Sequence, residues 1–267
     1  MSAWYGLGKR NKGVRIMHDF LRQIPVEYFI LREEYLSGLL GDMPVIKSGK
    51  RGDKEVLRTY SDDRKHYRET SSSNYFWKSV KKDYIKRQKI ASMLSNVKRL
   101  LRNYPQSRRH IRLKVINLEN IFDNNFFDSL IDEDCDYKNK TDYFYNGRHY
   151  RSRSEMMIAE ILDEMGLEFK HDVNISVNGT TYNVDFVIVF REFNRCIFIE
   201  FFGMCNDPDY NYDNSIKIES FMNANIYLGR DLIVFSGDLG YTPGADVIKS
   251  QLISIIGQLV CYHVREI

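Results

Sequence analysis

The sequence has few of the features that mark several common classes of protein. It contains four cysteines in 267 residues, and no two of them form a CxxC pair. This spacing argues against a disulfide framework or a zinc ribbon, and it is typical of reduced, structural thiols. No segment approaches the run of about 18 apolar residues expected of a membrane-spanning helix, and the start lacks the apolar stretch of a signal peptide. We therefore expect a cytoplasmic protein with no membrane partner.

The small net charge of +3 conceals a large asymmetry along the chain. Residues 1–115 contain 27 Lys and Arg against 11 Asp and Glu, whereas residues 116–267 contain 12 against 25. A basic half of this kind favours contact with a polyanion, and nucleic acid is the partner that we expect. The alternative is that the two oppositely charged halves attract each other.

The basic N-terminal region, 1–131, is expected to be mainly helical with short strands. Residues 1–24 are compatible with a helix, and strand-like runs occur at 26–31 and within 45–60. The polar segment 61–73 is expected to be a loop. The basic charge of this region makes it the expected nucleic-acid-binding part of the chain.

Within this region, apolar residues from 74 to 104 recur at three- and four-residue steps, which predicts a long helix. A series of Lys and Arg residues lies between them, so the helix has a basic face. Such a face supplies affinity for the phosphate backbone that does not depend on base sequence and that falls with salt. An ordinary solvated helix face is the alternative. The residues that we assign to nucleic-acid binding are Lys78, Lys81, Lys82, Lys86, Arg87, Lys89, Lys98, Arg99 and Arg102.

An acidic stretch, 132–142, is the expected linker to a C-terminal domain that spans 143–267. The apolar pattern predicts an α/β (α+β) domain with the element order α-β-β-β-α-β-α. Ser152 or Ser154 is the expected cap of its first helix. The first helix is expected to end at 165. The expected strands span 168–177, 181–190, 195–202 and 231–236, and the two later helices span 210–224 and 245–263.

Two carboxylates interrupt the most apolar strands of this domain. Asp185 lies in the run 182–190 and Glu200 in the run 196–203, and both runs predict strands that are buried on two faces. A buried carboxylate is costly unless a cation meets it. If the strands pair as a hairpin, the two carboxylates lie side by side. Together with the backbone carbonyl of Phe201 they supply oxygen ligands of the kind that Mg²⁺ prefers.

Two further polar residues lie beside apolar helix faces. Glu155 borders the buried stripe of its helix, and Lys217 shares a helix face with Phe221. An ammonium on a packed face requires a carboxylate or a substrate phosphate. Two structural alternatives stay open. Glu155 is also well placed for the dipole at a helix N-terminus, and Lys217 can form a purely structural salt-bridge cluster with Asp185 and Glu200.

The predicted order of elements, with an acid on the first helix, Asp on the second strand and Glu on the third, resembles the PD-(D/E)xK, restriction-endonuclease-like nuclease superfamily. More narrowly, 151–162 and 199–210, followed by Lys217, are similar to an uncharacterised bacterial group of such nuclease-like proteins, with an E-x-x-G-M motif. The resemblance covers roughly 143–240. It leaves the basic N-terminal region unassigned.

The resemblance implies a restriction-endonuclease-like domain with a central mixed sheet. It also implies a catalytic set of four residues. In this set Asp185 and Glu200 bind metal. Glu155 assists the site, and Lys217 orients or activates the attacking water. Phe201 contributes its carbonyl as a further metal ligand.

The sequence departs from the superfamily pattern in places that bear on activity. The lysine expected two residues after Glu200 is Phe202, and in the narrower group a histidine commonly stands at the position of Phe201. Val184 replaces a structural proline before the strand aspartate. Migration of the lysine to the following helix recurs in the superfamily, and Lys217 is the expected replacement.

The expected function is therefore a Mg²⁺-dependent nuclease, with Mn²⁺ as a substitute metal, that hydrolyses phosphodiester bonds. DNA is the favoured substrate, and enzymes of this kind occur in defence systems and mobile elements. The alternative is a catalytically inactive nuclease fold that acts as a nucleic-acid-binding or assembly module. A homodimer and an assembly with other proteins both stay open as oligomeric states.

Overall fold

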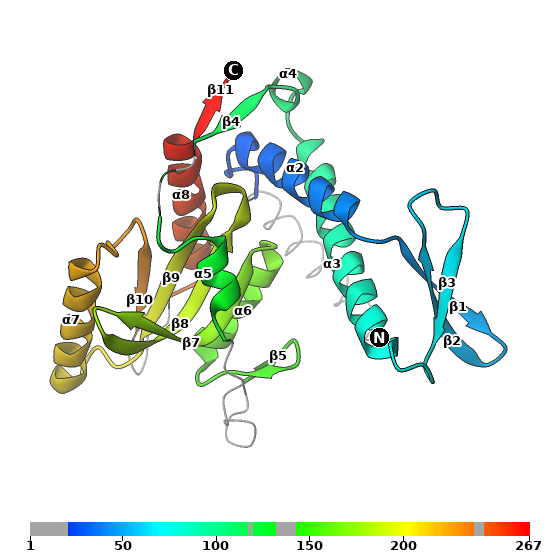
Figure 1. Cartoon of the computed structure of the whole chain (residues 1–267). Coiled ribbons are helices and arrows are strands. Elements are labelled where there is room, and N and C mark those ends of the chain that lie inside the picture. Colours follow the sequence, from blue (N-terminus) through cyan, green and yellow to red (C-terminus); the bar gives the residue numbers. More distant parts are fainter. Residues whose placement is uncertain (1–20, 117, 119, 132–142, 238–242) are drawn as a thin grey trace, which may run out of the picture. The chain divides into compact units, whose positions relative to one another are not determined.

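Helices and strands are grouped into two units along the chain (Figure 1). The smaller unit spans Val26–Ile111, and the larger contains the described residues of Arg112–Ile267 together with 21–25. The expected linker 132–142 lies outside the described residues, whereas 112–131, which we assigned to the N-terminal region, belongs to the larger unit. The structure is a computed structural model, and it describes residues 21–116, 118, 120–131, 143–237 and 243–267.

The smaller unit joins two packed helices to a three-stranded antiparallel sheet of order β1-β2-β3. The long helix predicted over 74–104 is confirmed, and so are the strands predicted within 45–60. The predicted helix over 1–24 falls almost wholly outside the described residues. The elements of this unit are α2 (Val26–Asp42), β1 (Ile46–Arg51), β2 (Lys54–Tyr60), β3 (Tyr67–Ser71), α3 (Trp77–Leu101) and α4 (Gln106–Arg109).

Two predictions for the smaller unit were wrong. The run 26–31 is the first part of α2 and not a strand. A short apolar run fits the periodicity of a strand as well as that of a helix. In the structure Tyr28, Arg32 and Leu36 are buried, and their four-residue spacing is that of one face of a helix. The polar segment 61–73 contains β3, which is held by backbone pairing to β2. Such pairing is independent of side-chain polarity, so composition alone did not reveal it.

The larger unit is built on a mixed four-stranded sheet of order β10-β9-β8-β7. Strands β7, β8 and β9 are antiparallel neighbours, and β10 joins β9 in parallel. Every helix and strand predicted between 152 and 263 is present, with small differences at the ends. These elements are α6 (Arg153–Glu164), β7 (Glu168–Val177), β8 (Thr180–Phe190), β9 (Arg195–Phe202), α7 (Pro208–Asn223), β10 (Leu232–Ser236) and α8 (Ala245–His263).

Short elements that we did not predict surround this sheet. Strand β4 pairs with β11 at the end of the chain, and β5 pairs with β6 just before α6. Helix α5 precedes α6 in the chain, and a 3-10 turn joins β8 to β9. Their bounds are β4 (Leu113–Val115), α5 (Asn124–Ser129), β5 (Phe144–Tyr145), β6 (Arg148–His149), η2 (Arg191–Phe193) and β11 (Val264–Glu266).

The local signals read from the sequence explain where the elements begin and end. Ser152 caps α6, and its hydroxyl accepts a hydrogen bond from the Glu155 amide at 3.1 Å. Asn178 and Gly179 join β7 to β8 with φ values of 51° and 82°, as a two-residue hairpin turn requires. The cap at Ser152 is one of the two alternatives that we predicted, and it is confirmed.

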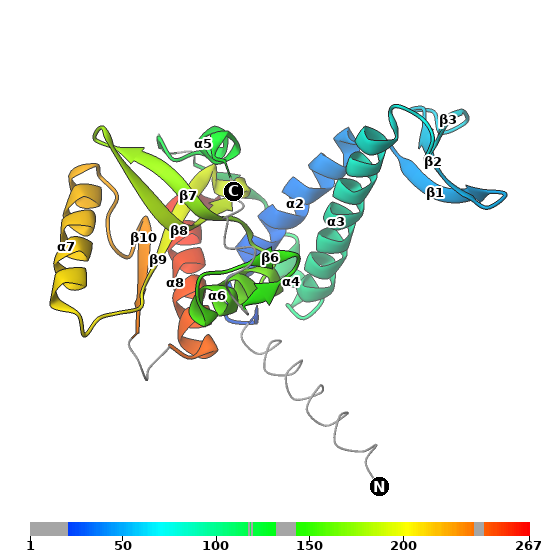
Figure 2. The ribbon, with the colours of Figure 1, turned by 90° about the horizontal axis from the view of Figure 1, so that it is seen from below.

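The sheet of the larger unit is covered on both faces. Figure 2 shows it between α7 on one side and α6 and α8 on the other. One core cluster joins Phe127 of α5 and Phe221 of α7 to Val187 and Phe198 of the central strands. No helix among the described residues is long and apolar enough to cross a membrane.

The packing of α5 gives a first prediction about the division of the chain. The Phe127 side chain is 2% exposed, so Phe127→Ala is expected to lower the free energy of unfolding by about 3–5 kcal/mol, because it leaves a cavity in the core of the larger unit. Phe144→Ala is the matched control, since Phe144 is 56% exposed. Urea unfolding measures both variants. Equal stability of the two would contradict the assignment of 112–131 to the larger unit.

Candidate functional site

The register of β8 and β9 brings the two strand carboxylates together. The strands pair through Phe186 and Ile199, and the next step of the same register sets Asp185 opposite Glu200. Both side chains point to the face of the sheet that α7 covers, because they alternate with Phe186 and Ile199. Asp185 is 8% exposed and Glu200 is 3% exposed. The predicted pair therefore lies side by side on adjacent strands, largely out of solvent.

Both carboxylate oxygens of Asp185 are engaged. The Phe201 amide donates to Oδ2 at 2.7 Å, and Arg151 Nη2 donates to Oδ1 at 2.6 Å. Burial, followed by the nearby Glu155 carboxylate, raises the pKa of Asp185 above its ordinary value. The Phe201 amide and Arg151 act in the opposite direction. Asp185 is thus held in a place where negative charge is in excess.

Glu200 is paired with Lys217 of α7. Lys217 Nζ lies 2.6 Å from Glu200 Oε1, and it also donates to the backbone carbonyl of Asn183 at 2.6 Å. Burial and the facing Asp185 carboxylate raise the pKa of Glu200 to about 8, although Lys217 lowers it. The structure therefore brings Lys217 into direct contact with the carboxylate pair.

Glu155 lies at the N-terminus of α6 and is 6% exposed. Its Oε1 accepts from the Ser152 hydroxyl at 3.2 Å, and its Oε2 accepts from the Arg151 amide at 3.2 Å. His171 Nε2 lies 3.0 Å from Oε2. These contacts fix the start of the helix, as the structural alternative for Glu155 predicts. They also place its charge close enough to raise the pKa of Asp185.

Arg151 is a member of the site that the sequence analysis missed. Its Nη2 lies 2.6 Å from Asp185 Oδ1 and 3.6 Å from Asp172 Oδ1, and its Nε lies 3.6 Å from Glu155 Oε2. One guanidinium therefore lies among three carboxylates from three different elements. Arg151 is the residue directly before the Ser152 cap. This position next to a predicted helix start was the only sequence feature that could have pointed to Arg151 as a site residue.

Asp172 is the second missed residue. It lies opposite Asp185 in the register of β7 and β8, and it is 6% exposed. Its φ of 57° is in the left-handed region, which is uncommon for a residue other than glycine and is strained within a strand. The residues on either side of it pair regularly with β8, so the distortion is confined to this position. No feature of the sequence predicted it.

These groups line an open pocket of about 550 Å³. The Phe201 amide points toward Asp185, and in an extended strand the amide and the carbonyl of one residue project to the same side. An extended backbone at Phe201 turns its carbonyl to the side of Asp185, and the role of this carbonyl as a metal ligand stays a prediction. The residues that line the pocket are Arg151, Ser152, Glu155, Asn183, Asp185, Glu200, Phe201, Phe202, Gly203, Met204, Tyr210, Asn214 and Lys217.

The oxygen atoms of this pocket fit a hard divalent cation. Mg²⁺ binds through one or two carboxylates and keeps several waters, so Asp185, Glu200 and the Phe201 carbonyl form a chemically suitable set. A cation also relieves the repulsion that raises the pKa values of the two carboxylates. Among the described residues there is no group of three or more His, Cys, Asp or Glu side chains arranged to hold a metal ion. Water would therefore complete the coordination.

The acids that follow β9 have structural roles. The Asp207 side chain accepts from the amides of Asp209 and Tyr210 and caps α7. Comparisons of the chain with protein-family models, with curated proteins and with solved structures found no match.

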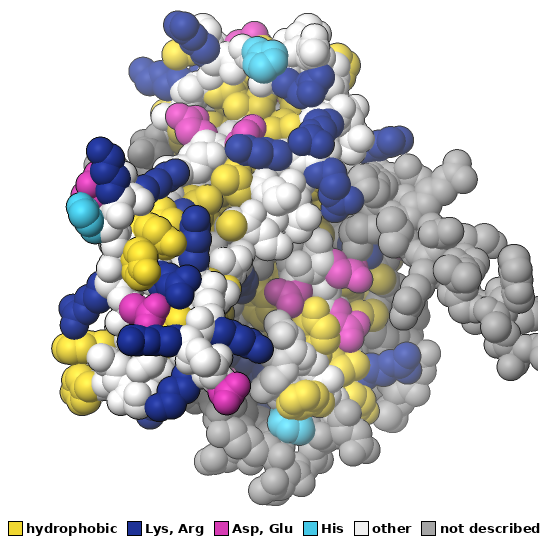
Figure 3. Space-filling view, turned by 90° about the vertical axis from the view of Figure 1, so that its right-hand side faces the viewer, with side chains coloured by type: hydrophobic (Ala, Val, Ile, Leu, Met, Phe, Trp, Pro, Cys, Tyr) yellow, Lys and Arg dark blue, Asp and Glu magenta, His cyan; other side chains and the backbone are white. Residues whose placement is uncertain are grey.

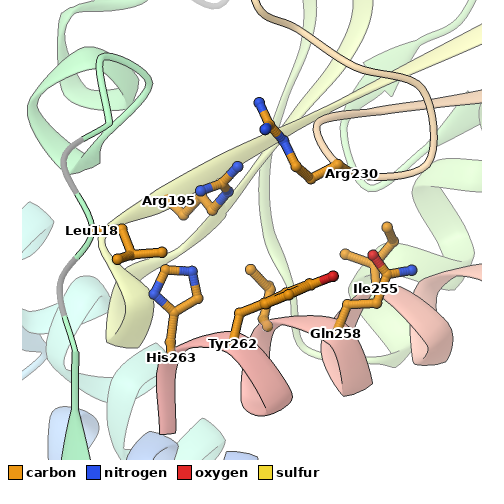
Figure 4. A pocket seen from close by; sticks show the side chains of 8 residues that line it. Leu118, Arg195, Arg230, Ile255, Gln258, Tyr262 and His263 are labelled. Atoms are coloured by element: carbon orange, nitrogen blue, oxygen red, sulfur yellow. The ribbon is translucent and has the colours of Figure 1, made fainter.

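A second pocket, of about 330 Å³, is lined by residues of β9 and α8 (Figure 4). Its cationic side chains, Arg195 and Arg230, both pair with the buried carboxylate of Asp231. Since both cations of this pocket already contact a carboxylate of the protein, we assign no ligand to it. Its lining residues are Leu118, Arg195, Arg230, Ile255, Gln258, Leu259, Tyr262 and His263.

The basic residues predicted to bind nucleic acid differ in their surroundings on α3. Arg87 Nη1 donates to the carbonyls of Leu40 and Met43 at the end of α2, which is a structural role. Lys81 pairs with Glu55, and Lys98 pairs with Glu33. The residues that are exposed and form no ion pair with another described residue are Lys78, Lys82, Lys86, Lys89, Arg99 and Arg102.

The raised pKa of Glu200 gives a prediction about stability and pH. A carboxyl with a pKa of 4.5 when unfolded and about 8 when folded stabilises the protein fully below pH 4.5. That contribution is lost as pH rises to about 8. Glu200→Gln removes this titration, so its unfolding free energy is expected to fall less than that of the wild type between pH 5 and 8, by up to about 1.4 kcal/mol per pH unit.

Urea unfolding at a series of pH values measures this slope. Glu219→Gln, at an exposed position of α7, is the matched control and is expected to keep the slope of the wild type. A wild-type slope in Glu200→Gln would contradict the raised pKa.

Arg87 and Lys86 give a second prediction, because they are neighbours with different surroundings. Arg87→Met removes the donor for two carbonyls at the end of α2, so it is expected to lower the unfolding free energy by about 1–3 kcal/mol. Lys86→Met is expected to change stability by less than about 0.5 kcal/mol, since Lys86 is exposed. Thermal and urea unfolding compare the two variants. Equal effects on stability would contradict the capping role of Arg87.

Proposed function

We propose that the chain is a Mg²⁺-dependent nuclease, with Mn²⁺ as a substitute metal, and that DNA is its favoured substrate. The observation that carries the proposal is the position of Lys217 Nζ, 2.6 Å from Glu200 Oε1, where Glu200 faces Asp185 across adjacent strands. An ammonium and two buried carboxylates in one open pocket form a suitable site for phosphodiester hydrolysis. The succession from α6 to α8 around a mixed sheet supports a restriction-endonuclease-like fold for this part of the chain.

Asp185, Glu200 and the Phe201 carbonyl hold the cation in this proposal. Once bound there, Mg²⁺ supplies Lewis-acid activation of water and neutralises charge on the scissile phosphate. The Lys217 ammonium stabilises the negative charge that develops on the phosphate oxygens. Glu155 acts as a positioning residue, because it holds Arg151 and the start of α6 in place beside Asp185.

The position of Lys217 also accounts for the departure at Phe202. A lysine two residues after Glu200 would point to the same face of β9 as Glu200. Phe202 occupies that position, is 8% exposed, and packs edge-on against Tyr210 of α7. Lys217 approaches from the same helix and places its ammonium beside Glu200. This supports the interpretation that the lysine has moved to α7.

The basic smaller unit supplies affinity for the substrate in this proposal. Val26–Ile111 contains 20 Lys and Arg against 10 Asp and Glu. In Figure 3, Lys and Arg side chains are spread over the face that is shown, with Asp and Glu side chains at fewer places among them. Such a surface binds the phosphate backbone without reading base sequence, and its affinity falls as salt rises.

One observation favours a second candidate function, a nuclease-like module without activity. Arg151 Nη2 lies 2.6 Å from Asp185 Oδ1, so the chain itself provides a cation at the carboxylate that is expected to bind metal. If Arg151 stays there permanently, the pocket serves the fold alone. The chain then acts as a nucleic-acid-binding or assembly module.

Cleavage assays separate the two functions. The wild type is expected to cut a plasmid or a labelled oligonucleotide when Mg²⁺ or Mn²⁺ is present and not in EDTA. Asp185→Ala and Glu200→Ala are expected to abolish cutting while the protein stays folded. Lys217→Met is expected to lower the rate about 100-fold or more, because it removes the charge that stabilises the transition state.

Lys249→Met is the matched control for Lys217→Met. Lys249 is also largely buried and ion-paired, at 3.1 Å from Glu164, but it belongs to α8. Its loss is expected to affect stability and to leave the rate nearly unchanged. Cleavage that persists in both alanine variants would contradict the active-site assignment. Metal-independent binding without any cleavage by the wild type would support the inactive module.

A further inference from the structure

The three-stranded sheet of the smaller unit has one face that does not pack on α3. Side chains alternate between the two faces along each strand, and the register of β1, β2 and β3 places alternate positions together. The face toward α3 includes Leu57, which is fully buried, and Ser48, whose hydroxyl accepts from Tyr84 of α3 at 3.2 Å. The opposite face, which we call the basic–aromatic face, contains Lys47, Arg51, Lys54, Arg58, Tyr60 and Tyr67.

Cations and aromatic rings alternate on the basic–aromatic face. Tyr60 and Tyr67 are cross-strand partners, with ring centroids 5.5 Å apart and planes inclined by 45°. Lys47 Nζ lies 5.0 Å from the Tyr60 ring, and the Arg58 guanidinium lies 5.5 Å from the Tyr67 ring. Tyr67 is 53% exposed, so about half of this side chain is open to a ligand.

The charge of this face selects a polyanion. Glu69 is the carboxylate that the strands contribute to it, and it is paired with Arg58 at 3.1 Å and Arg51 at 3.5 Å. Lys47 and Lys54 are exposed and form no ion pair with a described residue. The face therefore keeps a net positive charge after its internal pairs are counted, which is complementary to a chain of phosphates.

The aromatic rings of this face favour single-stranded over double-stranded nucleic acid. In a duplex the bases are stacked on each other, and a flat protein surface meets the phosphates and grooves. In a single strand the bases are free to stack on exposed aromatic side chains while cations contact the backbone. An acidic protein partner would satisfy the charges but would leave the paired, exposed rings without a specific role.

We propose that the basic–aromatic face of β1–β3 binds single-stranded nucleic acid, with a base stacked on Tyr67 and the backbone held by Lys47, Arg51 and Lys54. The inference rests on the proposed nucleic-acid substrate, and it adds a second contact surface to the basic residues of α3. The two surfaces are separate within the unit, because α3 packs on the other face of the sheet.

Fluorescence anisotropy with a labelled oligo(dT) and a labelled duplex of equal length tests the proposal with the full chain in EDTA. Tyr67→Ala is expected to weaken binding of the single strand about tenfold, because it removes one stacking platform. Tyr67→Phe keeps the ring and is expected to keep the affinity. Tyr75→Ala is the control, since Tyr75 is 93% exposed but lies outside the strands.

Lys47→Glu and Lys50→Glu form a matched pair on one strand. Both change the net charge equally, but Lys50 points to the opposite face of the sheet. Lys47→Glu is expected to weaken binding more than Lys50→Glu and to reduce the slope of affinity against salt by about one. Thermal unfolding of each variant verifies that it is folded.

Three results would overturn the proposal. They are equal losses in Lys47→Glu and Lys50→Glu, unchanged binding in folded Tyr67→Ala, and binding of the duplex in preference to the single strand. The nuclease proposal is tested apart from this, because binding is measured without metal and Asp185→Ala is expected to bind like the wild type. Normal cleavage together with normal binding in Tyr67→Ala would retain the nuclease proposal and reject this face.

Discussion

Two buried carboxylates that face each other across β8 and β9 impose the main constraint on the larger unit. Asp185 and Glu200 are both at most 8% exposed, and burial together with a neighbouring carboxylate raises the pKa of each of them. Such a pair persists only if cations meet it. Arg151 from the segment before α6 and Lys217 from α7 supply them, so both helices that flank the pocket are tied to the same pair.

The same contacts fit both functions of the site. The two functions differ in how the excess negative charge of the pocket is reduced. Glu155, Asp172, Asp185 and Glu200 contribute carboxylates, whereas Arg151 and Lys217 contribute cations that pair with them and His171 lies beside Glu155. If all four carboxylates are ionised, this leaves an excess of negative charge. A divalent cation offsets that excess, and protonation of Glu200 is the other way in which the protein can reduce it.

The larger unit could be predicted from its sequence in most respects, because its strands are long, apolar and bounded by turn residues such as Asn178-Gly179. Asp185, Glu200 and Lys217 were found because each interrupts an apolar pattern. Arg151 and Asp172 were missed because their roles depend on which strands become neighbours and on a left-handed backbone at Asp172. In the smaller unit, the apolar run 26–31 was too short to distinguish a strand from the first part of a helix, which it is.

A titration of Mn²⁺ followed by electron paramagnetic resonance tests the central claim most directly, because the signal of free aqueous Mn²⁺ is lost when the ion binds to the protein. The account predicts one site per chain, competed by Mg²⁺ and lost in Glu200→Ala, with the fold intact. Wild-type protein that binds no Mn²⁺, or binding that is unchanged in Glu200→Ala, would contradict the claim that the carboxylate pair is a metal site.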